Sequence, residues 1–545
     1  MTEEMFLPEM KDSKYLGLTP KRNWLGRRKG QPLKYKWKTK PFHHQVAAIK
    51  TLLNNGYGGA LLMEPRTGKT KVAIDWISIL HLAGRVNRVL IFCPVSVMGV
   101  WEEQLAMHCP IDYNLVVWDK KGRKKQDLPP YGRDRLDIVV LNYDAMSTAG
   151  GIMYDKNGKV RTDKEGNIRR SRSRGGKYTM RKKLKAWQPQ CIILDESHRI
   201  KSPAAAKSRS MHMLGPLADY RLLMTGTAVT KKKRVYDIYS QWQFLYPMRF
   251  RIGREPMNFA EFKSMFCVII QRNGYPQWVT NKNTKLLRKL IHQDAFAITR
   301  EECYDLPPRL DPEIIKVPLE ESASTYDQMA EDMVAKIHTG EITEASIKLV
   351  QGLRLQQITS GIARTESTPE YPKGRLVRIG REKLRILEDR LVDFFEADEK
   401  VVIAAQFIAD IYAIEKLCKK LRAKTYILKG GVKRHERDER RRSFQAYDGP
   451  AAFIMQPSAG SLGIDLSSSG TFIWYSLTRS YVDYTQAEDR IALNPRGTRF
   501  IYLIGEGTYD EVLYQSLQED GEVAREVMRR PESLLRSEEL RHSRM

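Results

Sequence analysis

The apolar and polar residues of the chain follow two different rhythms. Short apolar runs, typical of buried strands, alternate with longer segments whose apolar residues stand three or four positions apart, as in amphipathic helices. Repeated alternation of this kind predicts a parallel sheet covered by helices. It occurs twice: strands are expected at 60–62, 89–93, 138–141, 191–194 and 222–224, and again at 401–405, 426–428, 451–455, 472–475 and 500–504.

Residues 235–374 lack this strand rhythm and show helical spacing instead, at 237–246, 258–266, 285–292, 322–338 and 345–360. We therefore predict an α/β fold with two parallel-sheet domains in tandem and a helical insertion between them. The predicted parts are a basic N-terminal arm (1–40), a first sheet domain (41–234), the helical region (235–374), a second sheet domain (375–516) and a charged C-terminal tail (517–545).

A basic insert interrupts the first sheet domain at about 150–185. Its Asn157-Gly158 and Glu165-Gly166-Asn167 sequences are turn signals, so we expect a small hairpin followed by a flexible basic loop. The arginines that follow, between Arg169 and Arg174, have two interpretations. They form a solvated charge run, or they contact phosphates.

Composition constrains the partners. The 545 residues carry a net charge of +27, which favours a polyanion such as nucleic acid, or an anionic membrane surface. No apolar run approaches the roughly 18 residues of a membrane span, and the acidic N-terminus lacks the order of a secretory signal. The six cysteines stand singly, which fits a reducing cytosol and argues against a zinc site or a disulfide framework.

One segment carries a recognisable phosphate-binding pattern. Residues 63–70 read MEPRTGKT, between an apolar run and an amphipathic one. In a strand–loop–helix of this type the backbone N–H groups cradle phosphates. Lys69 would reach the terminal phosphates, and the Thr70 hydroxyl would help to hold Mg²⁺.

A second segment strengthens this interpretation. The apolar run that begins at Cys191 ends in the carboxylate pair Asp195-Glu196. Such a pair suits a metal ion and a water molecule beside a nucleotide's terminal phosphate. Together the two segments predict a machine driven by a nucleoside triphosphate.

The order and spacing of these segments resemble the Swi/Snf-like DNA translocases of helicase superfamily two, particularly compact versions of the phage type. The resemblance covers roughly residues 41–514. It implies two RecA-like sheet domains with ATP bound in the cleft between them, Mg²⁺ as the metal, and movement along double-stranded DNA. It also implies a cytoplasmic location, in a bacterium or a phage-infected host.

The resemblance assigns nucleotide-binding roles to individual residues. Gln45 matches the adenine-reading glutamine, whose amide both donates and accepts hydrogen bonds, and Arg66, Thr67 and Gly68 complete the phosphate loop with Lys69 and Thr70. Arg66 stands where many relatives have glycine. Asp195 would hold Mg²⁺ through water and Glu196 would orient the attacking water. In the second domain, Gly463 and Asp465 match a motif whose aspartate would face the ribose or orient an arginine.

The resemblance also assigns contacts with the nucleic-acid backbone, which would be independent of base sequence. These positions follow expected strands in both sheet domains. They are Pro94, Ser96, Trp101, Asn142, Tyr143, Thr225, Gln406, Ser458 and Gly460.

The match fails at one catalytic position. Gln486 to Arg490 resembles the start of the arginine-finger motif, but Leu493 stands where the family has a second arginine. An arginine finger stabilises charge on the transferred phosphoryl group and contributes factors of about 10³ to 10⁵ in rate. Arg496 is a substitute if Asn494-Pro495 shifts the helix end; otherwise Arg490 acts alone or hydrolysis is slow. The alternative functions are a low-turnover, ATP-switched nucleic-acid clamp or assembly factor, and an RNA helicase.

Overall fold

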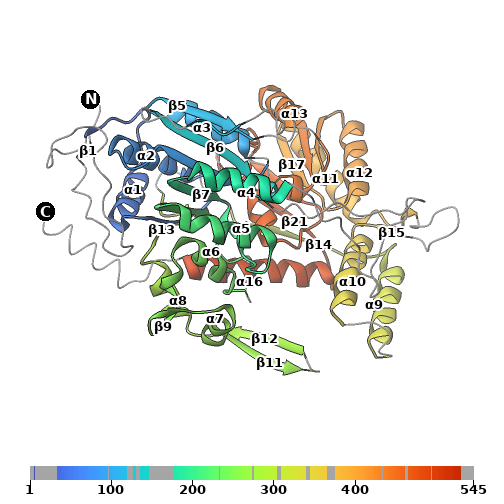
Figure 1. The fold of residues 1–545 in the computed structure, drawn as a ribbon. Coiled ribbons are helices and arrows are strands. Elements are labelled where there is room, and N and C mark those ends of the chain that lie inside the picture. The colour runs from blue at the N-terminus through green and yellow to red at the C-terminus, as the bar shows by residue number, and fades with distance from the viewer. Residues whose placement is uncertain are drawn as a thin grey trace, which may run out of the picture. The chain divides into compact units, whose positions relative to one another are not determined.

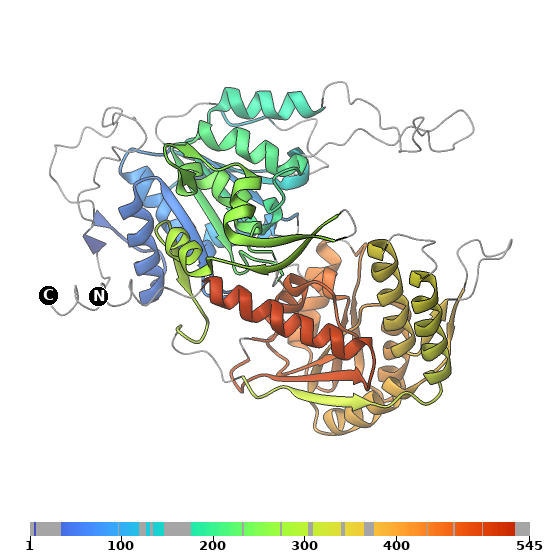
Figure 2. The same cartoon turned by 90° about the horizontal axis from the view of Figure 1, so that it is seen from below.

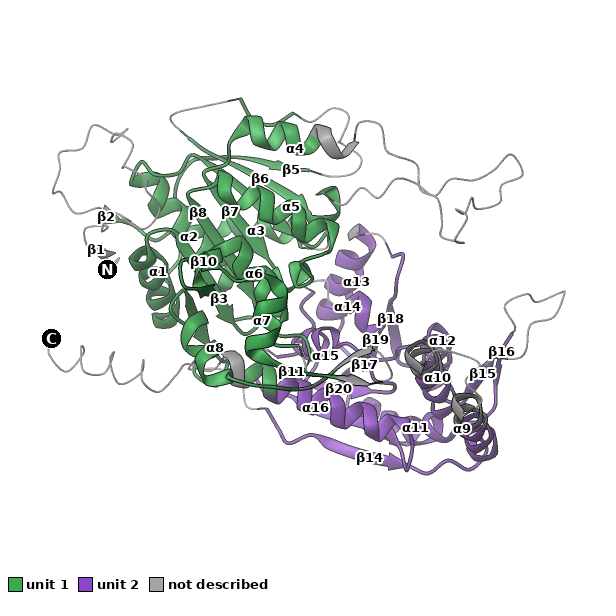
Figure 3. Ribbon diagram, turned by 60° about the horizontal axis from the view of Figure 1, so that its bottom comes forward, with its two compact units in different colours: residues 1–304, 523–545 green, residues 305–522 purple. Residues whose placement is uncertain are grey.

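The computed structural model describes residues 5–6, 34–95, 97–118, 127–130, 135–146, 176–231, 234–272, 275–303, 309–338, 344–364, 375–432, 434–460, 464–492 and 494–528. The chain divides into two compact units, shown in two colours in Figure 3. Unit 1 contains residues 1–304 and 523–545, and unit 2 contains residues 305–522.

Unit 1 is built on a parallel sheet of seven described strands, in the order β13-β3-β8-β7-β4-β6-β5 (Figure 1). Every neighbouring pair is parallel, so all carboxyl ends of the strands lie at one edge. The strands are β3 (Gly58–Met63), β4 (Arg88–Cys93), β5 (Tyr113–Val117), β6 (Leu136–Asn142), β7 (Cys191–Asp195), β8 (Tyr220–Thr225) and β13 (Ala295–Ile298).

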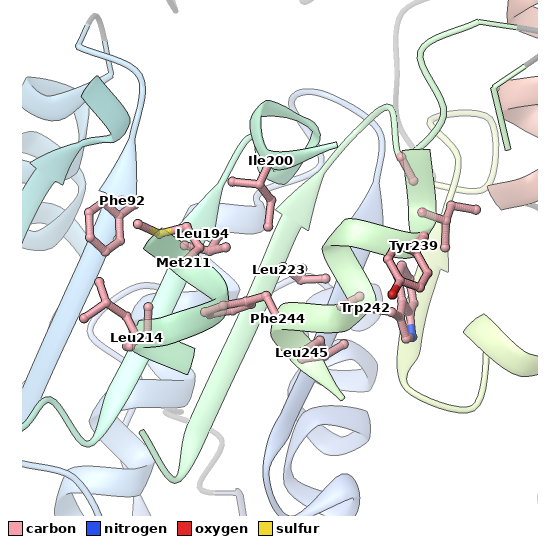
Figure 4. Close-up of a cluster of buried hydrophobic side chains, with 14 of the residues drawn as sticks. Phe92, Leu194, Ile200, Met211, Leu214, Leu223, Tyr239, Trp242, Phe244 and Leu245 are labelled. Atoms are coloured by element: carbon pink, nitrogen blue, oxygen red, sulfur yellow. The ribbon is translucent and has the colours of Figure 1, made fainter. Parts of the chain in front are cut away.

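Successive residues of these strands enter two separate cores, as the pleat requires. Leu61 and Ile91 face a core shared with α1 (His43–Asn55), α2 (Lys69–Leu82) and α3 (Met98–His108). Strand residues of the other face pack against α4 (Gly176–Trp187), α5 (Ala206–Leu214) and α6 (Asp237–Leu245). Figure 4 shows this second core, with Phe92, Leu194 and Leu223 beneath Met211, Leu214, Trp242 and Phe244.

Shorter elements complete unit 1. Several of them directly follow strands of the sheet, and others lie between α6 and β13 in sequence. They are β1 (Met5–Phe6), β2 (Lys34–Tyr35), η1 (Tyr143–Met146), η2 (Ser197–Ile200), η3 (Gly215–Leu217), η4 (Pro247–Arg249), β9 (Arg251–Ile252), β10 (Glu255–Pro256), α7 (Phe259–Phe266), β11 (Cys267–Arg272), β12 (Tyr275–Asn281) and α8 (Thr284–Ile291).

Unit 2 contains a second parallel sheet, whose described strands run in the order β14-β21-β20-β17-β19-β18. Strand β14 lies beside β21 at the edge (Figure 2). The strands are β14 (Glu313–Val317), β17 (Lys400–Ala404), β18 (Lys424–Leu428), β19 (Ala451–Met455), β20 (Thr471–Trp474) and β21 (Arg499–Gly505).

Helices α11 (Glu382–Glu396) and α12 (Ile408–Lys420) cover one face of this sheet and form its main core. A helix pair and a short two-stranded ribbon lie between β14 and α11 in sequence. The remaining elements are α9 (Ala323–His338), α10 (Glu344–Thr359), β15 (Ile362–Arg364), β16 (Leu376–Arg378), α13 (Arg434–Ala446), α14 (Pro457–Gly460), α15 (Tyr481–Glu488) and α16 (Tyr509–Met528).

The strands expected from the apolar runs are confirmed in both units, with small shifts at their ends. The sequence analysis missed β5 and β14 because these edge strands bury fewer residues and carry a weaker apolar signal. It also missed β13, an apolar run of only four residues. Four of the five residues of β14 are partly or fully exposed, and all five of β5 are half-buried. The segment expected to be helix-rich, without the strand rhythm, also contains the β11–β12 hairpin and the sheet strands β13 and β14.

Two further expectations need correction. The described end of the basic insert is the helix α4 and not a loop, because Leu184 and Trp187 pack into the core of unit 1. The turn signals at Asn157-Gly158 lie outside the described residues. The described end of the N-terminal arm is also packed, since the Tyr35 hydroxyl donates to Oδ1 of buried Asp75 at 2.7 Å.

All six cysteines are free and buried. In the part of the chain that the structure describes, helices with the length and apolar character needed to span a bilayer are absent.

Candidate functional site

The loop between β3 and α2 is held in one shape by glycine and by α1. Arg66 and Gly68 have left-handed backbone conformations, with φ of 66° and 86°. A Cβ on Gly68 would lie 2.0 Å from Nε2 of Gln45, and the left-handed φ would strain any larger residue there. The same Nε2 donates to the Thr67 carbonyl at 3.3 Å, and Gln45 is only 2% exposed. Gln45 therefore stabilises the conformation of the phosphate loop. Its expected contact with adenine stays a prediction.

Lys69 begins α2 and turns back over the loop. Its Nζ donates to the carbonyls of Met63 at 2.8 Å and Glu64 at 3.0 Å. The Thr67 hydroxyl donates to the Glu64 carbonyl at 2.7 Å and closes the loop. Thr70 follows Lys69 in the first turn of α2 and is half-buried. A helix N-terminus with a lysine and a hydroxyl is a favourable environment for phosphate oxygens.

Asp195 ends β7 and is held by residues of α3 and η1. The indole Nε1 of Trp101 donates to its Oδ2 at 3.0 Å, and the Tyr143 hydroxyl donates to its main-chain carbonyl at 2.7 Å. Burial raises the pKa of Asp195, while the indole hydrogen bond and the charge of Lys69 oppose that rise. The carboxylate is thus buried, oriented and within the electrostatic influence of the loop lysine.

Glu196 turns the chain sharply after β7, with a left-handed φ of 53°. Nδ1 of His198 lies 3.3 Å from its Oε2 and 3.2 Å from Oγ1 of Thr225, the last residue of β8. Burial lowers the pKa of His198 to about 3, so the ring is neutral at pH 7 and its contact with Glu196 is no ion pair. The imidazole therefore joins the carboxylate pair to the end of β8.

The turn after β8 is packed directly on the phosphate loop. A Cβ on Gly226 would lie 2.8 Å from Cδ of Pro65, so only glycine allows this approach. From the other side, the backbone N–H of Arg300, just after β13, donates to Oε2 of Glu64 at 2.9 Å. A conformational change in the phosphate loop would therefore displace the residues that follow both β8 and β13.

The oxygen donors near the loop suit a magnesium ion. Asp195 offers a carboxylate and Thr70 a hydroxyl, and both are hard oxygen ligands of the kind that Mg²⁺ prefers. Burial of Asp195 beside Lys69 leaves a carboxylate whose charge a cation would stabilise. The residue types and their burial fit the expected metal.

The described positions of unit 1 that are expected to contact nucleic acid lie at the carboxyl ends of β4, β6 and β8, apart from Trp101 on α3, and their side chains differ in exposure. Pro94 is half-buried, whereas Asn142 and Tyr143 are 3% and 4% exposed. Trp101 and Thr225 have no exposed surface. The direct nucleic-acid contact expected of the Trp101 side chain does not fit this burial, because its polar group is used on Asp195. Ser96 lies outside the described residues.

In unit 2, the backbone-contact positions follow β17 and β19. The Gln406 N–H donates to Oγ of Ser476 at 2.8 Å, and its carbonyl accepts from Gln456 at 3.3 Å. Ser458 and Gly460 belong to the short helix α14, directly after β19. Since β17 and β19 are neighbouring parallel strands, these residues meet at one edge of the sheet.

Two other expected site residues of unit 2, Asp465 and Arg490, are held by contacts within that unit. The Asp465 carboxylate accepts from Nε2 of Gln445 at 3.0 Å and from the Ser467 hydroxyl at 3.2 Å. Arg490 is 9% exposed, and its Nη1 lies 3.4 Å from the Ile464 carbonyl. The structure thus brings Arg490 beside the Asp465 segment. Gly463 and Leu493 lie outside the described residues.

Arg496 has different surroundings from Arg490. It lines a cavity of about 460 Å³ at the amino ends of β17, β20 and β21, together with Lys400 and Arg499. Helix α15 ends at Glu488, six residues before Asn494, so the expected break at Asn494-Pro495 comes after the helix is over. The role of Arg496 as a substitute for the arginine that is missing at Leu493 stays a prediction.

One polar network of unit 2 was missed by the sequence analysis. Buried Glu488, at the end of α15, accepts from Nε1 of Trp474 at 3.1 Å, from the Tyr502 hydroxyl at 2.5 Å and from Nη2 of Arg309 at 2.7 Å. It fixes the helix end that precedes Arg490. Arg309 stands 179 residues away in sequence, so no local pattern could have identified the pair.

Comparison with known proteins places the chain among helicase-type ATPases. It is 24% identical over 466 residues to the ISWI chromatin-remodeling complex ATPase CHR11 of Arabidopsis thaliana, covering 82% of this chain and 39% of that protein. It is 23% identical over 480 residues to the ATP-dependent DNA helicase DDM1 of the same plant, covering 82% and 56%. The chain thus spans about two-fifths to just over half of these relatives.

Among solved structures, the chain is similar to the Sulfolobus solfataricus SWI2/SNF2 ATPase core in complex with dsDNA. The identity is 21%, the TM-score is 0.38, and the match covers 88% of this chain and 91% of that one.

Two family descriptions match in succession along the sequence. Residues 382–492 match the helicase conserved C-terminal domain. Residues 42–362, more than half of the chain, match the SNF2-related domain. The chain therefore belongs to the SNF2-related family of helicase-type enzymes.

Proposed function

We propose that this protein couples ATP hydrolysis to movement along double-stranded DNA. The observation that carries the proposal is the arrangement at the carboxyl edge of the unit 1 sheet. There Lys69 covers the phosphate loop, Asp195 is buried under its influence, and Glu196 is tied through His198 to Thr225.

In this proposal the loop residues bind the phosphates of ATP. Lys69 exchanges its bonds with the Met63 and Glu64 carbonyls for phosphate oxygens, and Thr70 and Asp195 hold Mg²⁺. When bound, the metal neutralises charge on the phosphate oxygens. Glu196 orients the attacking water and takes its proton, the part of a general base.

The turn after β8 supplies the route by which nucleotide state reaches the rest of unit 1. His198 contacts both Glu196 and Thr225, and Gly226 touches Pro65 of the loop. Loss of the terminal phosphate would change the loop, and the change would pass to β8 through these contacts. Such order-dependent segments are the usual switch of nucleotide-driven proteins.

Duplex DNA is the proposed track for two reasons. The net charge of +27 suits a phosphate backbone, and a relative over 82% of this chain bears the name ATP-dependent DNA helicase. As a compact phage-type member, the protein would act in the cytoplasm of a bacterial host. The five-part domain division stays part of the same proposal.

The test is steady-state ATP hydrolysis with no nucleic acid, duplex DNA, single-stranded DNA and RNA, each at several salt concentrations. We expect the largest stimulation with duplex DNA, and a steep loss of stimulation as salt rises. Displacement of a third strand from a DNA triplex then reports movement. Preferential stimulation by RNA would contradict the proposal and favour an RNA helicase.

A second candidate function is an ATP-switched clamp or assembly factor with little turnover. It is favoured by Leu493, which replaces the second arginine of the finger motif. The variant Leu493→Arg separates the two functions. A large gain in hydrolysis would favour the clamp, whereas an unchanged rate means that the native protein already has the arginines it needs.

A further inference from the structure

Trp101 makes a contact that the assigned motifs do not explain. It lies on α3, has no exposed surface, and donates from Nε1 to Oδ2 of Asp195 at 3.0 Å across 94 residues of sequence. A buried indole N–H normally finds a partner, but a neutral acceptor would suffice. Here the partner is the carboxylate expected to hold the metal.

The contact leaves that carboxylate with little freedom to rotate. The Tyr143 hydroxyl fixes the Asp195 main chain from η1, and the indole fixes one carboxylate oxygen from α3. Groups that hydrogen-bond to a metal ligand orient it and tune its basicity, and their loss typically costs about 10- to 100-fold in metal affinity.

Helix α3 also has a direct connection to the segment expected to contact nucleic acid. It begins at Met98, immediately after the loop that starts at Pro94, and the Trp101 N–H donates to the Val97 carbonyl at 3.2 Å. A displacement at the start of α3 therefore moves the residue that holds Asp195.

We propose that Trp101 is a positioning residue that orients the Asp195 carboxylate for Mg²⁺ and links that carboxylate to the nucleic-acid-contact loop before α3. The inference rests on the proposed function, because it takes a magnesium-bound nucleotide as the ligand of unit 1. It gives Trp101 a role inside the protein that replaces the surface contact expected from the sequence.

The molecule supplies a matched control for the test. Trp76 on α2 is equally buried and belongs to the same core, but its Nε1 has no hydrogen-bond partner among the described residues. Trp101→Phe and Trp76→Phe therefore remove the same atoms from the same core. Only the first removes a hydrogen bond to Asp195.

The experiment measures equilibrium binding of ADP to the full chain, once with Mg²⁺ and once with EDTA. For Trp101→Phe we expect the Kd of Mg·ADP to rise about 10-fold while the Kd in EDTA is unchanged. Trp76→Phe should change neither value. In an Asp195→Asn background, Trp101→Phe should have no further effect, because the two residues act as one unit.

Equal weakening with and without Mg²⁺, or an effect as large in Trp76→Phe, would mean general damage to the core and would overturn the inference. Thermal unfolding of both variants checks that they remain folded. Duplex DNA should alter the Kd of Mg·ADP in the native protein but not in Trp101→Phe. If DNA altered the Kd of Mg·ADP equally in Trp101→Phe and in the native protein, the proposed link between Asp195 and the loop before α3 would be overturned. The orienting role of Trp101 would still be supported.

The proposed function and this inference fail in different ways. A native protein that binds no Mg·ADP would contradict both. A native protein that binds Mg·ADP and is stimulated by duplex DNA, while Trp101→Phe behaves like the native protein, would contradict the inference alone.

Discussion

The two units share one strand order but differ in chemistry. Setting aside the edge strand β13, the strands of unit 1 lie in the order β3-β8-β7-β4-β6-β5, and those of unit 2 in the order β14-β21-β20-β17-β19-β18. Numbered by their sequence within each unit, both orders are 1-6-5-2-4-3, and every pair is parallel in both. Equivalent strand ends can therefore be compared directly.

The first strand of each sheet shows the difference. In unit 1, β3 leads into the loop with Gly68 and Lys69. In unit 2, β14 leads into Pro318 and Leu319, which line a cavity of 300 Å³ together with Asp327 and Glu506. Acidic side chains repel phosphate, so this position in unit 2 is unsuited to a nucleotide's phosphates.

Other strand ends keep the same expected role in both units. The segment after β4 in unit 1, with Pro94, corresponds to the segment after β17 in unit 2, with Gln406. Likewise, Asn142 at the end of β6 corresponds to Ser458 after β19. The same topology therefore places equivalent strand ends in both units. The side chains at those ends decide which of the two sheets can bind the phosphates of a nucleotide.

The largest effect is expected from Lys69→Ala. Without the ammonium group over the loop, binding of nucleotide phosphates should be lost and hydrolysis should fall to background, as measured by ATP turnover and by binding of a fluorescent ADP. The matched change in unit 2 is Glu506→Ala, at the equivalent edge of that sheet, and it should alter neither measurement. Loss of binding in both variants would contradict the asymmetry between the units.

The next effect tests the arginines of unit 2. Arg490→Ala should lower the turnover number by about 10³-fold if Arg490 stabilises the transferred phosphoryl group, with ATP binding retained. Arg496→Ala should change turnover by less than about 10-fold, because Arg496 lines a cavity at the opposite edge from Gln406. The reverse ranking, in single-turnover assays, would make Arg496 the functional arginine.

A smaller effect is expected at the carboxylate pair of unit 1. Glu196→Gln should reduce turnover by about 10²-fold through loss of the general base, while the Kd for Mg·ATP stays within about threefold of the native value. The same assay on Asp195→Asn should show weaker Mg·ATP binding instead. If Glu196→Gln weakened binding and left turnover intact, the roles assigned to the pair would be exchanged.

The smallest effect compares buried carboxylates and concerns stability alone. Burial raises the pKa of Asp410 to about 7, partly opposed by the charges of Arg378 and Lys383, from about 3.9 for an ordinary aspartate. Between about pH 4 and 7 the folded protein holds a proton that the unfolded chain has lost, so stability falls as pH rises through this window.

Asp410→Asn should therefore leave stability near pH 4 unchanged and increase the free energy of unfolding above pH 7 by up to about 4 kcal/mol. Urea unfolding at pH 4, 6 and 8 measures this. ATP turnover should be unchanged, in contrast to Asp195→Asn in unit 1. A variant that is destabilised at pH 8 would show that the charged form of Asp410 is the one that the fold uses.

The sequence by itself determined the twofold strand–helix pattern, the phosphate loop and the carboxylate pair. These signals are local: apolar runs report buried strands, and the residues of the loop stand side by side in the chain. The same locality explains the positions of Lys69, Thr70, Asp195 and Glu196 at one sheet edge, since parallel strands bring their carboxyl ends together.

Only the tertiary structure decided which side chains support these groups. The contact of Trp101 with Asp195 and of Arg309 with Glu488 join residues 94 and 179 positions apart. The edge strands β5 and β14 are equally non-local, because neighbouring strands and not their own apolar content define them. Trp101, which the sequence analysis expected to contact nucleic acid, is buried and hydrogen-bonded to Asp195. The sequence could not show this, because a pattern of residue types does not say which helix face a distant carboxylate will pack against.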